Sequence, residues 1–161
     1  AALDNFRRYA EQRLTEAMAI HIRDRTGRVR LEFTGDPGRV IFVAPAAAGP
    51  GGGGVYRFEL SLAGGDARYR PLALKQTLYR TTPLGLAPEE APAPAAMEHL
   101  SQASVAGLSF RYFGAPARGS QPQWQTQWPG DTLPELVEIA ITIGGGQVER
   151  SVVPLRLRAG S

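Results

Sequence analysis

Apolar residues recur at helical spacing through the first part of the chain. They occupy the i, i+3, i+4 and i+7 positions of one face: Leu3, Phe6, Ala10, Leu14, Ala17, Met18 and Ile22. Polar and charged residues fill the positions between them. The pattern predicts an amphipathic helix from Leu3 to about Arg23, with Gly27 just beyond its end. Because this helix opens on an apolar residue without a capping signal, we expect it to be the second part of a longer helix.

Alternating apolar and polar residues predict strands over most of the remaining chain. The predicted strands cover residues 28–33, 39–44, 55–62, 68–80, 105–113, 136–143 and 148–157. Turn sequences at 35–38, 64–66 and 144–146 predict that the strands on either side pair as hairpins. Pro71 lacks a backbone N–H, so we expect an edge position or a bulge there. Met97 and Leu100, three residues apart, predict a short helix from about Ala95 to Gln102.

These elements predict an α+β fold in which a long N-terminal helix packs on antiparallel β-sheets. We expect about seven strands in two small sheets. The 161 residues suit one domain, 1–161, made of a truncated N-terminal helix at 1–24 and a β-rich head at 28–158. The 19 glycines and 13 prolines are well above the usual share and concentrate in 45–54 and 81–96, which we predict to be surface loops.

Composition removes several classes of function. The chain has no cysteine, which excludes disulfides, thiolate catalysis and cysteine-ligated zinc. The net charge is +3, but acidic residues are interleaved with the arginines of the first quarter, so no nucleic-acid surface is predicted. This sequence contains no run of about 18 apolar residues that would span a membrane.

The sequence offers no constellation of catalytic or ligand-binding residues. Residues 49–54 match G-x-G-x-x-G, but a strand follows where a phosphate site needs a helix N-terminus. His21 and His99 have no partners at metal-ligand spacing, and Glu89 and Glu90 lie in a predicted loop. We therefore expect no catalytic, cofactor or metal site, and a protein that is not an enzyme.

Two tryptophans in the last third allow two interpretations. Trp124 and Trp128 lie in a loop rich in glycine, proline and glutamine. They could form stacking platforms for a sugar or peptide, as in a periplasmic ligand-binding module. We favour the alternative, in which they hold a long loop against the core.

The length of the predicted helix suggests that part of it is left uncovered and can bind partner proteins. A rod of about 20 residues is roughly 30 Å long, and short strands cover only part of it. We expect Leu14, Ala17, Met18 and Ile22 to be buried in the protein's own core. The predicted partner-binding residues lie on the first half of the helix: Leu3, Phe6, Arg7 and Ala10.

The last third resembles a known family. The resemblance rests on these residues: Val105-x-x-Leu108-x-Phe110-Arg111-Tyr112, Trp124-x-x-x-Trp128-Pro129, Leu133-Pro134-x-x-Val137-x-Ile139 and Glu149-Arg150. This pattern is similar to the J-type minor pseudopilin of bacterial type II secretion, and the N-terminal helix agrees with it. The resemblance is closest over residues 105–157.

The resemblance implies a structural subunit at the tip of the secretion pseudopilus that helps to initiate its assembly for protein export. It implies I- and K-type minor pseudopilins as partners, with secreted substrate proteins as further candidates, and no nucleic acid. It also implies an anchor in the inner membrane through a missing N-terminal helix, with the head in the periplasm. A minor pilin of a type IV pilus is the alternative with the same fold, and a hydrolase is a distant third.

Overall fold

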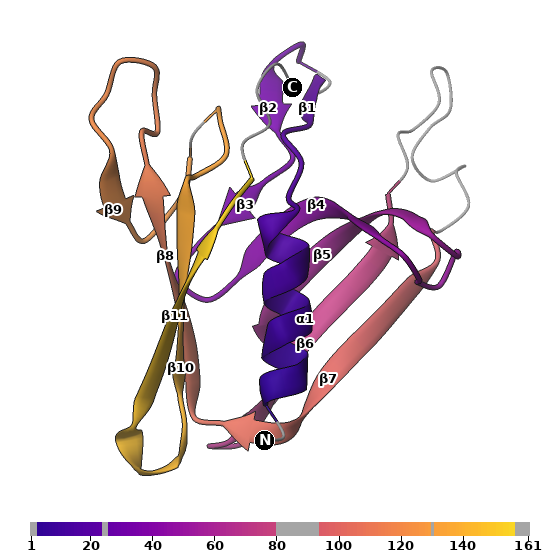
Figure 1. Ribbon diagram of the computed structural model, residues 1–161, viewed down its shortest axis with the longest axis vertical. Helices are drawn as coiled ribbons and strands as arrows, with labels where there is room; N and C mark the ends of the chain where they lie inside the picture. Colours follow the sequence, from indigo (N-terminus) through magenta and orange to yellow (C-terminus); the bar gives the residue numbers. More distant parts are fainter. Residues whose placement is uncertain (1–2, 24–25, 80–93, 130, 157–161) are drawn as a thin grey trace.

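The computed structural model describes residues 3–23, 26–79, 94–129 and 131–156. In this part of the chain it contains one α-helix and eleven strands, arranged in three antiparallel sheets (Figure 1). Helix α1 spans Asp4–Thr15, and a short 3-10 turn, η2, spans Gly144–Gly146. The strands are β1 (His21–Arg23), β2 (Val29–Leu31), β3 (Thr34–Gly35), β4 (Val40–Ala46), β5 (Gly54–Leu62), β6 (Arg70–Leu78), β7 (Ala96–Val105), β8 (Gly107–Gly114), β9 (Gln123–Gln125), β10 (Leu136–Thr142) and β11 (Val148–Pro154).

Helix α1 is about two turns shorter than the predicted helix. Its last amides bond in the tighter i to i−3 pattern, and the backbone N–H of Met18 then donates to the carbonyl of Val43 in β4, at 2.8 Å. The backbone N–H of Glu32 donates to the carbonyl of Ile20, also at 2.8 Å. Hydrogen bonds to distant residues therefore end the helix, although the apolar spacing continues past Thr15.

The segment after α1 forms a strand, which changes the predicted pairing of the first hairpin. β1 pairs with β2, whereas β3 pairs with β4. In the predicted hairpin between 28–33 and 39–44, the first strand is therefore wrong, because Thr34–Gly35 pairs with β4 instead of residues 28–33. Leu31 and Phe33 are buried as expected, but Val29 is 49% exposed because the small β1–β2 sheet stands apart from the core (Figure 1).

The five-stranded sheet has the order β3-β4-β5-β6-β7. The predicted hairpin of β5 and β6 is confirmed. The register between β6 and β7 shifts between Pro71 and Ala73, so the predicted bulge is confirmed too. The predicted helix at 95–102 is wrong: residues 96–102 belong to β7, the edge strand of the sheet.

The four-stranded sheet has the order β11-β10-β8-β9. Its three long strands and the turn at η2 agree with the predictions. Only Ala106 separates β7 from β8, and its amide donates to Thr142 at 2.7 Å. The chain therefore passes from one large sheet to the other at a single residue.

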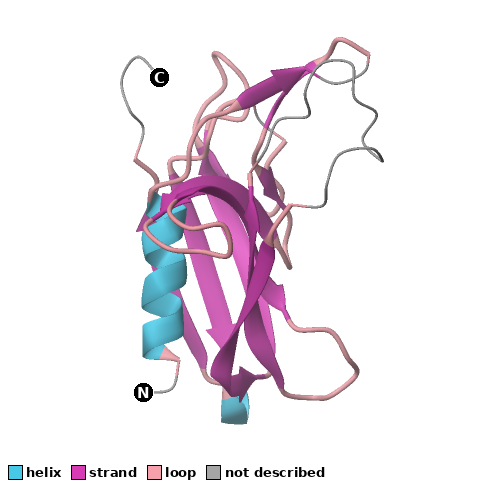
Figure 2. Ribbon diagram, turned by 90° about the vertical axis from the view of Figure 1, so that its right-hand side faces the viewer, coloured by secondary structure: helices cyan, strands magenta, loops and turns pink. Residues whose placement is uncertain are grey.

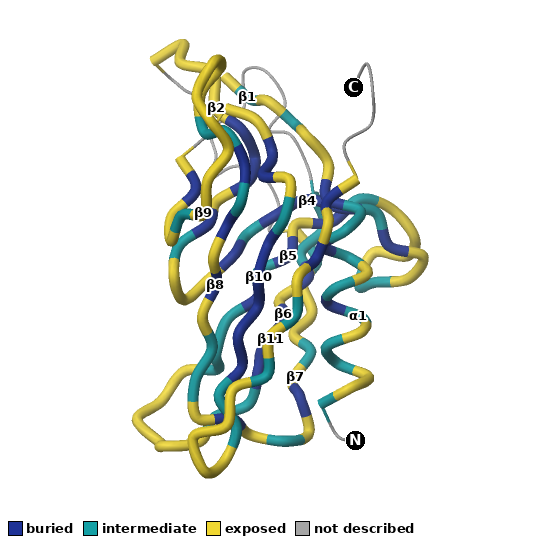
Figure 3. Tube along the Cα trace, turned by 60° about the vertical axis from the view of Figure 1, so that its left-hand side comes forward, coloured by how far each residue is buried: buried dark blue, intermediate teal, exposed yellow. Residues whose placement is uncertain are grey.

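One core joins the helix to both large sheets. Helix α1 contacts β4 on one sheet and β11 on the other, and it lies along one side of them (Figure 2). The buried positions follow the centre of β10, the inner face of β8 and one face of α1 (Figure 3). The large buried side chains include Leu14, Phe42, Phe58, Phe110 and Tyr112. This confirms the predicted α+β fold of a helix on antiparallel sheets.

The glycine-rich loop after β4 is held in place, which the sequence did not indicate. The amide of Gly51 donates to the hydroxyl of Tyr56 at 3.2 Å, and this hydroxyl donates to the carbonyl of Gly52. The side-chain amide of Gln76 donates to Ala48 at 3.0 Å. The predicted loop at 81–96 lies mostly outside the described residues, as do Glu89 and Glu90.

Candidate functional site

The first half of α1 carries the residues predicted to bind partners, and the structure separates them into two groups. Leu3 and Phe6 are partly buried and pack against the margin of the core. Arg7 is also partly buried, and its guanidinium contacts Glu149 of β11 at 3.0 Å and Asp4 at 3.9 Å. Leu3, Phe6 and Arg7 therefore keep surface that another molecule can reach.

Ala10 belongs to the core. It is 2% exposed, so the expectation that it lacks an internal partner is wrong. The small side chain lets the helix approach the sheets closely at this point. Farther along, Leu14 and Ala17 are buried as predicted. Met18 is 37% exposed and Ile22 is only partly buried in β1, because the helix ends before either of them.

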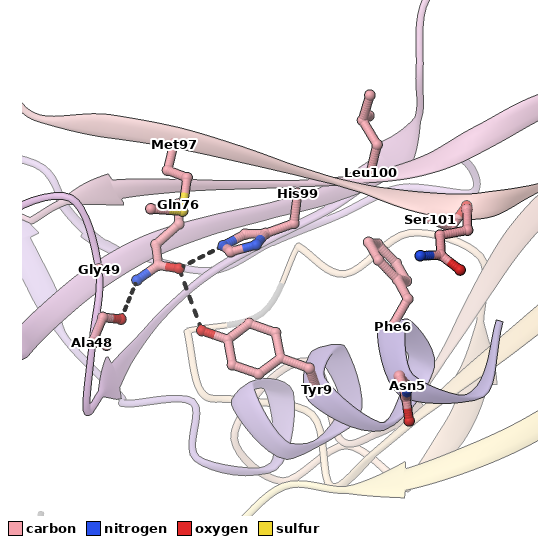
Figure 4. Close-up of a pocket in the computed structure, with 11 residues that line it drawn as sticks. Asn5, Phe6, Tyr9, Ala48, Gly49, Gln76, Met97, His99, Leu100 and Ser101 are labelled. Atoms are coloured by element: carbon pink, nitrogen blue, oxygen red, sulfur yellow. Dashed lines mark hydrogen bonds between the residues drawn. The ribbon is translucent and has the colours of Figure 1, made fainter. Parts of the chain in front are cut away.

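A groove of about 720 Å³ lies between α1 and β7, and Phe6 forms part of its wall. Asn5, Phe6 and Tyr9 line it from the helix, whereas Met97, His99 and Ser101 line it from the strand (Figure 4). The groove has apolar walls and a polar base. This composition suits a protein segment that carries apolar side chains.

Gln76 organises the polar base of the groove. It is 0% exposed, and its carbonyl oxygen accepts hydrogen bonds from the Tyr9 hydroxyl at 3.3 Å and from Nε2 of His99 at 3.0 Å (Figure 4). The rings of Tyr9 and His99 lie 5.6 Å apart. Burial raises the pKa of the Tyr9 hydroxyl above its ordinary value. The network therefore fixes the helix to the sheet through side-chain hydrogen bonds.

The sequence could not assign this groove, because His99 and Met97 were expected on a short helix. Their alternate positions on β7 place both side chains on the face that looks toward α1. Residues 96–105 show no clean alternation of apolar and polar positions, and the 3-residue spacing of Met97 and Leu100 fits a helix.

The two tryptophans have different roles, so they do not form a shared stacking platform. Trp128 is 4% exposed, and its indole N–H donates to Thr132 at 2.7 Å. Its backbone pairs with Gly35, which ties the loop to the other sheet and confirms the loop-holding interpretation for this residue. Trp124 is 38% exposed on β9, where it lies against Phe113 and the guanidinium of Arg111.

An ion cluster crosses the outer face of the four-stranded sheet. Arg111 binds Glu138 through two hydrogen bonds of 3.0 and 2.8 Å, and Arg150 adds a third of 3.2 Å. The Arg111 hydrogen bond is the main reason that the pKa of Glu138 lies below its ordinary value. The cluster joins the three neighbouring strands β8, β10 and β11, so its role is structural.

The remaining candidate groups do not converge on a site. Nε2 of His21 lies 2.7 Å from the carbonyl of Asp131, at the surface. Among the residues that the structure describes, no three His, Asp or Glu side chains are grouped so as to hold a metal ion. Within the same residues, no helix is long and apolar enough to cross a membrane.

Comparison with known proteins identifies the family. Residues 1–155 match the family described as "Type II secretion system (T2SS), protein J". The Type II secretion system protein J of Xanthomonas campestris pv. campestris is 34% identical over 150 residues, which cover 91% of this chain and 68% of that protein. This match favours the secretion family over the type IV pilin alternative.

A solved structure has the same fold. It is a chain of the GspK-GspI-GspJ complex from the type 2 secretion system of enterotoxigenic Escherichia coli, with a TM-score of 0.62 and 14% sequence identity. The similarity covers 98% of this chain and 97% of that chain. The fold is thus that of a pseudopilin head. From the family match over residues 1–155 and the curated relative, we conclude that this chain belongs to the protein J family of minor pseudopilins of the type II secretion system.

Proposed function

We propose that this chain is a structural subunit at the tip of the type II secretion pseudopilus, where it helps to initiate pseudopilus assembly for protein export across the outer membrane. Family membership supports this proposal. The arrangement of the site supports it as well, because α1 presents apolar surface and a groove rather than a set of reacting groups. We propose no enzymatic activity.

The proposed partners are the I- and K-type minor pseudopilins. The support is the similar fold of a chain in the GspK-GspI-GspJ complex. We further propose that a membrane-spanning helix precedes α1, anchors the protein in the inner membrane and leaves the head in the periplasm. Under this arrangement α1 lies beside the helices of its neighbours.

The observation that carries the proposal is the position of Leu3 and Phe6. They are about one turn apart, with Leu3 at the N-cap of α1 and Phe6 in its first turn, and both are apolar and only partly buried. Arg7 lies beside them, paired with Glu149. A neighbouring helix would bury the remaining apolar surface, at about 25 cal/mol per Å². Ala10 is left out of the proposed partner surface because it is already buried.

The test compares two substitutions on the same helix. Phe6→Asp should leave the head folded and lower its affinity for the I- and K-type heads, because a carboxylate would have to enter an apolar contact. Gln12→Asp is the matched control, since Gln12 is exposed on α1 and outside the proposed surface. The measurements are a pull-down or interferometry with the two heads and a circular dichroism melt of each variant.

A third variant separates folding from binding. Leu14 is 0% exposed, so Leu14→Asp should unfold the head by placing an unpaired charge in the core. If Phe6→Asp melts as low as Leu14→Asp, or binds the partner heads as well as the unmodified protein does, the proposed division of the helix is wrong.

A further inference from the structure

Among the residues that the structure describes, the outer edge of β7 has no pairing strand. β7 is the last strand of the five-stranded sheet, and among the described strands it pairs with β6 alone (Figure 1). A β-strand edge exposes backbone donors and acceptors that another strand can bind. The free edge adjoins the groove lined by Phe6, so the two features form one continuous surface.

The register identifies which backbone groups are free. The amide of Leu78 donates to the carbonyl of Ala95 at 2.8 Å, so these two residues form a hydrogen-bonded pair. Such pairs alternate along antiparallel strands. The N–H and C=O groups of Met97 and His99 therefore point to β6, whereas those of Ala96, Glu98 and Leu100 point outward. All three of these residues are exposed.

The usual protection of a strand edge is weak here. Residues 96–105 contain neither proline nor lysine, and Glu98 is their single charged residue. The bulge opposite Pro71 and Ala73 disturbs the strand only after Leu100. Apolar side chains are exposed on both faces of the regular part: Met97 is 41% exposed and Leu100 is 53% exposed.

We propose that an extended strand of a neighbouring pseudopilin head adds to the edge of β7, with backbone hydrogen bonds to Ala96, Glu98 and Leu100. Alternate side chains of the added strand would lie beside Met97 and enter the groove next to Phe6, so apolar residues fit there. The inference rests on the proposed function, and it adds a second contact to that of α1.

Charge complementarity favours a different protein over a second copy of this chain. Two β7 edges paired antiparallel about their centre would place Glu98 opposite Glu98, and like charges directly opposite each other are destabilising. A partner strand with a basic residue at this position would pair with Glu98 instead. The occupant is therefore an extended strand with apolar residues on both sides of a basic one.

A proline substitution tests the backbone contact. Glu98→Pro removes one outward N–H without removing a hydrogen bond to β6. It should weaken binding to the I- or K-type head at least tenfold. Glu98→Ala retains the N–H and is the matched control. Because it removes the carboxylate alone, it should change the affinity less than Glu98→Pro does.

Amide hydrogen exchange of the unmodified head gives a second readout that does not depend on a variant folding. Binding should slow the exchange of the Ala96, Glu98 and Leu100 amides at least tenfold, whereas those of Met97 and His99 are already bonded to β6. A second outcome is that Phe6→Asp weakens the complex, but binding leaves the exchange of these three amides unchanged. This result would overturn the inference about β7, whereas the proposed function would still hold. If the head binds neither partner, both fail. Protection of the same amides by self-association would overturn the assignment to a different protein.

Discussion

The ring of Tyr112 on β8 occupies the space that a side chain at Gly35 would need. A Cβ at Gly35 would lie 2.4 Å from Cζ of Tyr112, well inside van der Waals contact. The Tyr112 hydroxyl also donates to the carbonyl of Asp36 at 2.8 Å. These contacts join the four-stranded sheet to the β3–β4 turn of the five-stranded sheet, and burial raises the pKa of Tyr112 far above its ordinary value.

Gly35→Ala should therefore destabilise the head. The added methyl group forces the Tyr112 ring or the β3 backbone to move, at a cost of about 1–3 kcal/mol. Gly38→Ala is the control in the same turn, since the nearest atom to a Cβ there is 4.0 Å away. Urea unfolding of both variants measures the difference. Equal stability of the two would show that the sheets adjust freely at this contact.

The two tryptophans should respond very differently to truncation. Trp128→Ala removes a buried side chain and should cost about 3–5 kcal/mol, whereas Trp124→Ala should cost about 1 kcal/mol because that ring is partly exposed. Thermal melts measure both changes. A carbohydrate screen tests the ligand-binding alternative directly, and saturable binding that Trp124→Ala abolishes would restore it.

Glu138 should make the head more stable at neutral pH than in acid. Its folded pKa is lowered, so its contribution is present above the unfolded value of about 4.3 and is lost as the pH falls through the folded value. Glu138→Gln should reduce the fall in unfolding free energy as the pH drops below the unfolded value. Glu135→Gln is the control, because Glu135 is exposed on the neighbouring loop. Identical acid profiles of Glu138→Gln and the unmodified head would contradict this account.

We predict that a chelator leaves the melting temperature unchanged. The sequence shows no cluster of Asp, Glu or His at ligand spacing, and metal binding would be linked to folding. The measurement is a thermal melt with and without EDTA. A fall of several degrees, reversed by adding a divalent cation, would reveal a site.

The sequence by itself determined most of the long strands and two of the buried positions of the N-terminal segment. The alternating residues of β5 and β8 and the glycine turn at 144–146 are local signals, because one face of each of these two strands is buried. Leu14 and Ala17 were predicted in the core for the same reason. The residues from Val105 to Arg150 were also sufficient to indicate the family.

Tertiary structure alone decided where α1 ends, how β2 pairs and what β7 is. Each depends on hydrogen bonds between residues far apart in the chain, such as Met18 to Val43, which local spacing does not encode. The candidate site has the same origin. Phe6 could be predicted as an apolar position on a helix. The groove beside it, however, depends on the hydrogen bonds by which Gln76 joins Tyr9 and His99. The strand edge of β7 is open because β7 is last in the order of the described strands.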